Sequence, residues 1–223
     1  MKTYLNKFSK KILDFIYPPV CGICGKLCND DICRKCQILL LSKIEAGIDD
    51  YSLDDTKYFE EHIYIFNYNG IIREKILQYK FQEKTYLYKI FLKIILNNKK
   101  IYNKFKNYDI IIPVPLHKKR KIERGYNQCE IIAKNISKKS NLFLNTISLQ
   151  KEINTVAQST LNRDQRHENI KNAYICRNKE LIKNKKILIF DDVYTTGNTV
   201  NECSKELKCA GAGKIGILTI AKV

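Results

Sequence analysis

Two adjacent aspartates, Asp191 and Asp192, follow directly after the apolar residues 187–190 and precede a short hydroxylated loop. The loop residues are Thr195, Thr196, Gly197, Asn198 and Thr199. A loop of this type that opens onto a helix presents free backbone N–H groups, and the helix dipole favours an anion there. We therefore expect the loop to bind a phosphate. Carboxylates beside a phosphate would repel it, so the aspartates are expected to hold the hydroxyl groups of a sugar that carries the phosphate, or to assist its divalent ion.

The alternative is an ordinary strand–turn–helix connection with an acidic turn. It would require a buried strand, two acids and a Thr-Thr-Gly-x-Thr loop to coincide by chance. A Walker A loop is excluded because no Gly-Lys-Thr or Gly-Lys-Ser sequence follows. The segment therefore predicts a phosphate site at the carboxyl end of a buried strand, where open α/β sheets bind ligands.

Cysteines form a second group with chemical potential near the start of the chain. Two C-x-x-C pairs, Cys21 with Cys24 and Cys33 with Cys36, can supply a tetrahedral shell of four sulfurs. Such a shell leaves no open position, so we expect a structural metal, with Zn²⁺ as the ion and an iron–sulfur cluster as the alternative. Redox-active or buried free thiols are disfavoured because the motif occurs twice and follows no βα pattern. Cys28 is expected to be a bystander.

The elements that must position these groups can be read from hydrophobic periodicity. Strand patterns cover residues 62–68, 109–114, 142–149, 186–190 and 214–220, and helical patterns cover residues 71–79, 85–96, 127–138 and 198–208. Strands that alternate with helices predict an α/β fold with a parallel sheet flanked by helices. An acidic, turn-prone stretch in residues 37–58 predicts a boundary between an N-terminal part (1–50) and a larger domain (59–223).

Apolar residues at helical spacing between Leu5 and Ile16 predict an amphipathic helix that docks on the body of the protein, with a membrane-surface helix as the alternative. No run approaches the roughly 18 apolar residues of a membrane span, and the N-terminus lacks the apolar region of a secretory signal. Nine cysteines in such a chain predict reduced thiols. We therefore expect a cytoplasmic protein that is not an integral membrane protein.

The 223-residue length suits one α/β domain with a small appendage. The formal net charge of +17 would attract polyanions. Lys, Ile and Asn are all abundant, as in proteins encoded by AT-rich genes, so the charge alone does not identify a nucleic-acid partner.

Residues 187–199 closely resemble the 13-residue motif of type I phosphoribosyltransferases. With the cysteine knuckle ahead of this motif, nearly the whole chain resembles the ComF family, named for competence proteins of bacterial DNA uptake. The resemblance implies a type I phosphoribosyltransferase fold that binds phosphoribosyl pyrophosphate (PRPP) with Mg²⁺. It also implies that Asp191 and Asp192 are catalytic residues that bind the ribose hydroxyls, and that residues 195–199 bind the 5-phosphate.

Other segments resemble the family as well: Pro18-Pro19, residues 78–81, residues 113–128 and residues 158–174. The contacts expected for pyrophosphate or phosphate are Lys80, Pro115, Leu116, Arg120 and Arg124. A solvated basic run is the alternative for residues 118–121. Gly125 is expected to allow close approach of the backbone to a ligand. Asn172 stands where the family pattern has Gly, and the polar residues 151–172 are expected to form an active-site flap.

Two functions are consistent with these features. The first is an enzyme that transfers a phosphoribosyl group from PRPP to an acceptor that the sequence does not identify. The second is a non-catalytic protein on the same scaffold that handles single-stranded DNA, in line with the family's connection to transformation. Proteins of the competence machinery are possible partners in either case. The intact aspartate pair favours ligand binding, because a purely electrostatic role would not require it.

Overall fold

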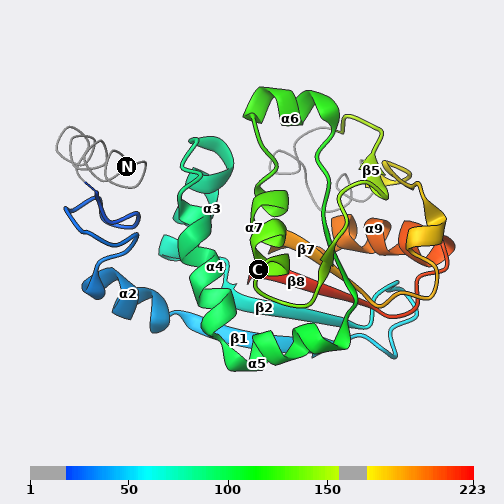
Figure 1. Ribbon diagram of the computed structural model, residues 1–223, viewed down its shortest axis with the longest axis horizontal. Helices are drawn as coiled ribbons and strands as arrows, with labels where there is room; N and C mark the ends of the chain where they lie inside the picture. Colours follow the sequence, from blue (N-terminus) through cyan, green and yellow to red (C-terminus); the bar gives the residue numbers. More distant parts are fainter. Residues whose placement is uncertain (1–18, 156–169) are drawn as a thin grey trace, which may run out of the picture. The chain divides into compact units, whose positions relative to one another are not determined.

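The computed structural model describes residues 19–155 and 170–223, which divide into compact units before and after the junction of residues 44 and 45. In the larger unit a six-stranded sheet has the order β1-β2-β8-β7-β3-β4 (Figure 1). Its strands are β1 (Ile44–Asp50), β2 (Glu61–Asn67), β3 (Ile110–Pro113), β4 (Phe143–Leu144), β7 (Ile187–Tyr194) and β8 (Ile215–Lys222). The pairs β2–β8, β8–β7, β7–β3 and β3–β4 are all parallel, which confirms the predicted sheet.

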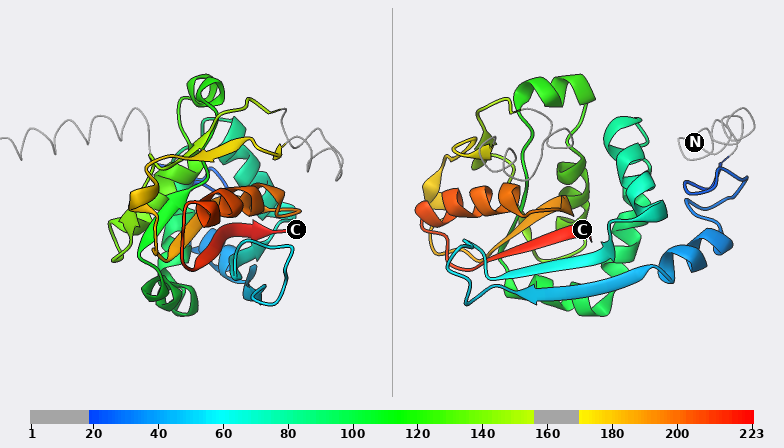
Figure 2. Two further views of the ribbon diagram at one scale, coloured as in Figure 1. Left: turned by 90° about the vertical axis from the view of Figure 1, so that its right-hand side faces the viewer. Right: turned by 180° about the vertical axis from the view of Figure 1, so that it is seen from behind.

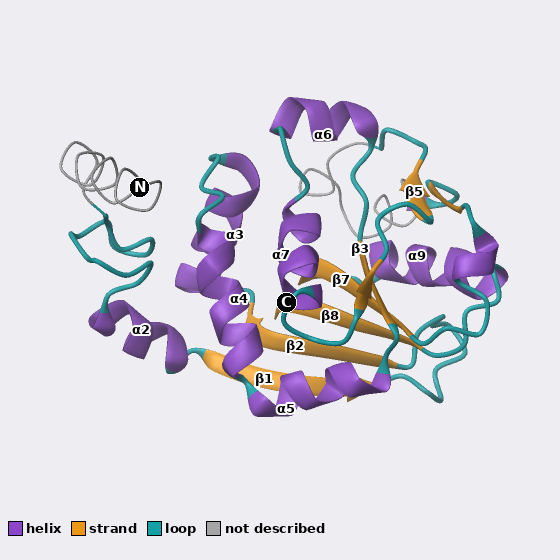
Figure 3. Ribbon diagram, viewed as in Figure 1, coloured by secondary structure: helices purple, strands orange, loops and turns teal. Residues whose placement is uncertain are grey.

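Helices and short connections link these strands (Figure 3). The helices of the larger unit are α3 (Gly70–Phe81), α4 (Leu87–Asn97), α5 (Lys99–Lys104), α6 (Lys118–Arg124), α7 (Gln128–Ser137) and α9 (Asn198–Cys209), with 3₁₀ turns η1 (Phe105–Asn107) and η3 (Lys179–Leu181). A second, two-stranded antiparallel sheet joins β5 (Leu149–Lys151) to β6 (Tyr174–Cys176). Figure 2 shows β6 next to α9.

Strand β7 lies inside the sheet and is apolar on both faces, as expected for a central parallel strand. Ile187 and Ile189 belong to a buried cluster that also contains Val200 of α9. Leu188 and Phe190 alternate with them and therefore face the other side of the sheet. Helix α7 contacts β7 but contributes nothing to the α9 cluster. Helices thus cover both faces and leave the carboxyl ends of the strands free to form a site.

The single strand predicted over residues 142–149 is wrong, because the structure divides it into β4 and the start of β5. The Asn145 side chain causes the break. Its Oδ1 accepts hydrogen bonds from the backbone N–H groups of Ile147 (3.1 Å) and Ser148 (3.0 Å), which forms a side-chain-mediated turn. Strand β4 can therefore pair with β3 while β5 leaves the main sheet.

The junction between the two compact units comes earlier than the boundary expected from the sequence, because residues 44–50 form the edge strand β1. Gly47 lies within this strand, and a Cβ atom there would overlap the ring of Tyr64. A glycine in an edge strand can thus have a packing reason.

The smaller unit is described from residue 19 onward and contains helix α2 (Arg34–Leu41). The amphipathic helix expected between Leu5 and Ile16 lies outside the described residues, as does Pro18. Residues 156–169 of the expected flap are outside them too. In the part of the chain that the structure describes, no helix has the length and apolar character needed to cross a membrane.

Candidate functional site

A cavity of about 380 Å³ lies at the carboxyl ends of β3 and β7. Most of the residues expected to bind a ligand line it: Lys80, Pro115, Leu116, Arg120, Arg124, Asp191, Asp192, Thr195 and Thr199. The structure thus brings together groups that are far apart in the sequence. Thr196, Gly197 and Asn198 are not among its lining residues. Thr196 and Gly197 lie in the turn between β7 and α9, and Asn198 is the first residue of α9.

The two aspartates lie within β7, which continues past them to Tyr194 instead of ending at Phe190. Asp192 is almost fully buried, at 2% exposure, and two side chains hold its carboxylate. The Lys80 ammonium from α3 lies 2.7 Å from Oδ1, and the Gln128 amide from α7 donates to Oδ2 at 2.9 Å. Lys80 is therefore engaged by Asp192 in this structure, although the sequence analysis expected it to contact pyrophosphate.

Asp191 has a different environment from its neighbour. Its Oδ1 accepts a hydrogen bond from the backbone N–H of Asp192 (2.8 Å) and lies 3.5 Å from the Cys129 thiol. Burial, followed by the nearby charge of Asp192, raises the pKa of Asp191 to about 7. Burial alone would lower the pKa of Lys80, but the two aspartates overcome this effect and raise it. Near neutral pH the site therefore holds a charged lysine beside two carboxyl groups, of which Asp191 is close to its titration midpoint.

The loop after β7 has the conformation expected of an anion-binding turn. Gly197 has a φ of +77°, in the left-handed region that glycine favours, and it is the N-cap of α9. A Cβ atom at this position would also overlap the Tyr194 side chain. The backbone amides at the start of α9 and the side chains of Thr195 and Thr199 can together receive one phosphate.

Arg120 and Arg124 lie on a short helix, α6, that follows β3 along the chain. The side chain of His117 caps this helix by accepting a hydrogen bond from the Lys119 N–H at 3.3 Å. Arg124 donates to Gln128 Oε1 at 2.5 Å and lies over the ring of Phe81. Helix α6 thus directs two guanidinium groups to the cavity.

Gly125 terminates α6 with a φ of +77°. No described protein atom lies within 4 Å of the position that its Cβ would take. The left-handed conformation of the helix cap explains the glycine, and close approach of its backbone to a ligand stays a prediction.

Several lining residues were not predicted from the sequence. Gln128 and Cys129 come from the first turn of α7, and Lys151 and Tyr174 come from paired positions on β5 and β6. The polar Gln128 at the start of an otherwise apolar helical face was the available signal for the first pair. Nothing in the local sequence indicates that Lys151 and Tyr174 meet, because the segments that carry them are far apart along the chain.

Asn172 has a φ of +57°, in the left-handed region. Asparagine tolerates this conformation better than most residues other than glycine, so its presence where the family pattern has Gly preserves the local backbone. Its N–H donates to Glu202 Oε1 at 2.8 Å, which ties the segment before β6 to α9.

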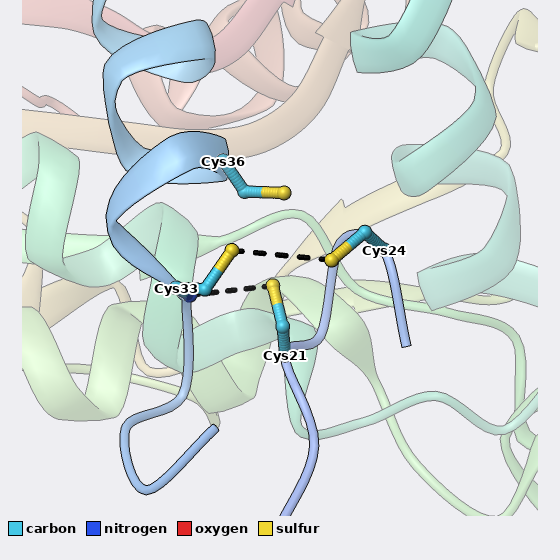
Figure 4. A group of neighbouring side chains, drawn as sticks. All are labelled: Cys21, Cys24, Cys33 and Cys36. Atoms are coloured by element: carbon cyan, nitrogen blue, oxygen red, sulfur yellow. Dashed lines mark hydrogen bonds between the residues drawn. The ribbon is translucent and has the colours of Figure 1, made fainter. Parts of the chain in front are cut away.

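The second candidate site lies in the smaller unit (Figure 4). Ligand atoms of Cys21, Cys24, Cys33 and Cys36 all lie within 4.8 Å of one another. A tetrahedral zinc ion with Zn–S bonds of roughly 2.3 Å requires sulfurs about 3.8 Å apart. The Sγ atoms of Cys24 and Cys33 are 3.9 Å apart, so the arrangement fits zinc with little adjustment. Cys28 is not a member of this cluster.

Backbone N–H groups favour the thiolate form of one cysteine in this cluster, which is the form that binds a metal cation. The N–H of Cys33 donates to the Cys21 sulfur at 3.3 Å. Burial opposes the thiolate, but hydrogen bonds from backbone N–H groups outweigh it and lower the pKa of Cys21 to about 6. Burial and the neighbouring thiols raise the pKa of Cys36. A metal ion would displace the protons that remain on the thiols, so its binding stabilises the folded unit.

Comparison with known proteins finds similar sequences over most of the chain. Residues 125–223 match the family described as a phosphoribosyl transferase domain. The chain is 30% identical over 202 residues to "Competence protein ComFC" of Streptococcus pneumoniae, a match that covers 91% of this chain and 80% of that protein. It is 30% identical over 152 residues to "Competence protein F" of Haemophilus influenzae, covering 66% of each, just under two thirds. It is 29% identical over 114 residues to "DNA utilization protein YhgH" of Escherichia coli K12, covering 51% of this chain and 49% of that protein.

Among solved structures, the allosteric regulatory enzyme of purine biosynthesis aligns with a TM-score of 0.39 and 14% identity, covering 59% of this chain and 25% of that chain. This similarity is too low to carry an argument. The Streptococcus pneumoniae match is much more extensive, since it covers four fifths of that protein at 30% identity. Taken with the α/β sheet and the cysteine cluster ahead of it, this match shows that the chain belongs to the ComF family.

Proposed function

We propose that the cavity at the carboxyl ends of β3 and β7 binds PRPP, or a related phosphoribosyl ligand, together with Mg²⁺. The observation that carries the proposal is that Asp191 and Asp192 line the same cavity as Thr195 and Thr199 of the loop capped by Gly197. A sugar phosphate needs both parts, because the loop suits its phosphate and the carboxylates suit its hydroxyl groups.

Each part of the proposed site has a distinct task. The first turn of α9 receives the 5-phosphate, and the aspartates accept hydrogen bonds from the ribose hydroxyls. Arg120 and Arg124 of α6 donate to the pyrophosphate oxygens, where Mg²⁺ supplies further charge neutralisation. If transfer takes place, the bond between the ribose anomeric carbon and pyrophosphate breaks, the acceptor bonds to that carbon, and pyrophosphate leaves. The carboxylates stabilise the positive charge that develops on the sugar.

The proposed structural metal is Zn²⁺ at Cys21, Cys24, Cys33 and Cys36. Four thiolates leave no position for a substrate, so this metal would stabilise the small unit and take no part in the chemistry of the cavity. The cytoplasm is the proposed location, because it keeps thiols reduced and available as ligands, and all nine cysteines are free.

Equilibrium dialysis with labelled PRPP and Mg²⁺ tests the proposal. Replacing both aspartates, Asp191→Asn with Asp192→Asn, should weaken PRPP binding by at least about a hundredfold, since each charged hydrogen bond contributes about 1.5–3 kcal/mol. The matched control is Asp54→Asn with Asp55→Asn, another adjacent pair that does not line the cavity. Equal affinity in the two double variants would show that the aspartates do not bind the sugar.

A role in DNA uptake is the biological setting that we propose. The relatives are named as competence and DNA utilization proteins, and the net charge of +17 favours contact with a polyanion. Handling of single-stranded DNA, with competence-machinery proteins as partners, is therefore the second candidate function. Fluorescence anisotropy with a labelled oligothymidylate should then show affinity that falls steeply with salt concentration. DNA binding that is unchanged in the Asp191/Asp192 double variant would assign DNA to a surface separate from the cavity.

A further inference from the structure

Lys151 lines the cavity, and its hydrogen-bonding and ring partners are neutral. Lys151, at the end of β5, lies opposite Tyr174 of β6, and its Nζ is 5.4 Å from the centre of the tyrosine ring. The same ammonium donates to Thr155 Oγ1 at 2.7 Å. Among the described residues, it forms no ion pair with a carboxylate.

Three other cations that line the cavity have polar partners of a different kind. Lys80 contacts Asp192 at 2.7 Å. Arg120 lies 3.9 Å from Glu123 on its own helix, and Arg124 is held by Gln128. Lys151 differs from these three because its polar partner is a hydroxyl group and not a carboxylate or an amide.

The surroundings of Lys151 disfavour its charge when no ligand is present. Burial is the largest effect and lowers the pKa of its ammonium, although nearby groups that include Asp191 act in the opposite direction. A partly buried cation without a direct ion pair is costly, and an anion placed beside it removes much of that cost. The cavity therefore offers an incomplete ion pair that a ligand can complete.

We infer that Lys151 is a ligand-binding residue that donates to a phosphate oxygen of the bound molecule. The identity of that molecule as a phosphoribosyl compound rests on the proposed function, whereas the need for an anion rests on the contacts of Lys151 itself. This inference gives the β5–β6 sheet a function. The sheet places the Lys151 ammonium at the cavity, in addition to the groups that the Thr195–Thr199 loop and α6 place there.

Calorimetric titration of three variants tests the inference. Lys151→Met keeps the length of the side chain and removes the charge, Lys151→Arg restores a cation, and Lys185→Met is the control at an exposed lysine outside the cavity. The probes are PRPP with Mg²⁺, inorganic pyrophosphate and ribose 5-phosphate. Lys151→Met should weaken PRPP binding about tenfold or more, Lys151→Arg should recover most of it, and Lys185→Met should match the wild type.

The two smaller probes show which phosphate Lys151 contacts, because only the probe that carries that group should lose affinity in Lys151→Met. Thermal unfolding separates binding from a structural role. Unfolding without ligand should stay cooperative in Lys151→Met, so that a loss of affinity in this variant reports lost binding and not a lost fold.

The outcomes also separate this inference from the proposed function. Wild-type PRPP binding that persists unchanged in Lys151→Met would refute the role of Lys151 and leave the phosphoribosyl site intact. Binding of pyrophosphate that depends on Lys151, without any binding of PRPP, would support the anion site and refute the phosphoribosyl proposal. Absence of binding to all three probes in folded wild-type protein would refute both.

Discussion

Asp191 should make the ligand-free protein less stable as the pH rises. Its pKa is about 7 in the folded protein, against about 3.9 in an unfolded chain. Between these values the folded state holds one proton more than the unfolded state, so the free energy of unfolding falls as pH increases. Below pH 4 both states are protonated and above pH 7 both are ionised, so the loss develops between these limits.

The size of the effect follows from the shift. A displacement of about three pKa units corresponds to about 4 kcal/mol at about 1.4 kcal/mol per unit. Asp191 lines a cavity that water can enter, which screens its charge, so we expect about 2–4 kcal/mol. Asp191→Asn keeps the shape of the side chain and retains an oxygen that can accept the Asp192 N–H. The variant should therefore be more stable than the wild type above pH 7, by this amount.

Urea unfolding of the wild type and of Asp191→Asn between pH 4 and pH 8 gives the difference in their free energies of unfolding at each pH. This difference isolates the contribution of Asp191, because other groups titrate over the same range in both proteins. In particular, burial lowers the pKa of His62 to about 4, so this histidine makes the folded protein more stable as the pH rises, opposite in sign to Asp191. A free-energy difference between variant and wild type that does not change with pH would refute the assignment of the raised pKa to Asp191.

Three further predictions test other parts of the structure. Cys24→Ser should release the bound metal and lower the unfolding midpoint, as measured by metal analysis and calorimetry, whereas Cys28→Ser should retain one metal ion per chain. Equal metal content in the two variants would contradict the ligand assignment. Gly197→Ala should lower the free energy of unfolding by about 1–2 kcal/mol and weaken binding of the sugar phosphate. The reason is that residue 197 has a φ of +77° and that a Cβ atom there would overlap Tyr194. Unchanged urea unfolding and unchanged affinity would argue against a left-handed cap. His62→Gln should reduce the loss of stability between pH 6.5 and pH 4, and an acid-unfolding curve identical to that of the wild type would contradict a buried neutral histidine at this position.

Local chemistry made the two candidate sites predictable. The order of apolar strand, acidic pair and hydroxylated turn in residues 187–199 is contained in one stretch, and the structure places that stretch as strand, turn and helix. The four cysteines likewise lie within one short segment and form one cluster. In both cases the residues that cooperate are close in sequence, so their spacing carries the information.

The remainder depends on contacts between distant segments. Lys151 reaches the cavity only because β5 pairs with β6, and this pairing joins segments on both sides of residues 156–169. The sequence did not predict strand β1, because Gly47 and its acidic neighbours have low strand propensity. Pairing at the edge of the sheet and packing against Tyr64 outweigh this low propensity in the folded protein. The raised pKa of Asp191 is also a property of the folded state, since burial and the nearby charge of Asp192 produce it.

The central claim, a phosphoribosyl site in the cavity, is tested most directly by isothermal titration of the zinc-loaded wild-type protein with PRPP in the presence and absence of Mg²⁺. The account predicts saturable binding, with one PRPP per chain, that tightens when Mg²⁺ is present. Absence of binding under both conditions, in protein shown to be folded by its cooperative unfolding, would contradict it and leave single-stranded DNA as the ligand to pursue.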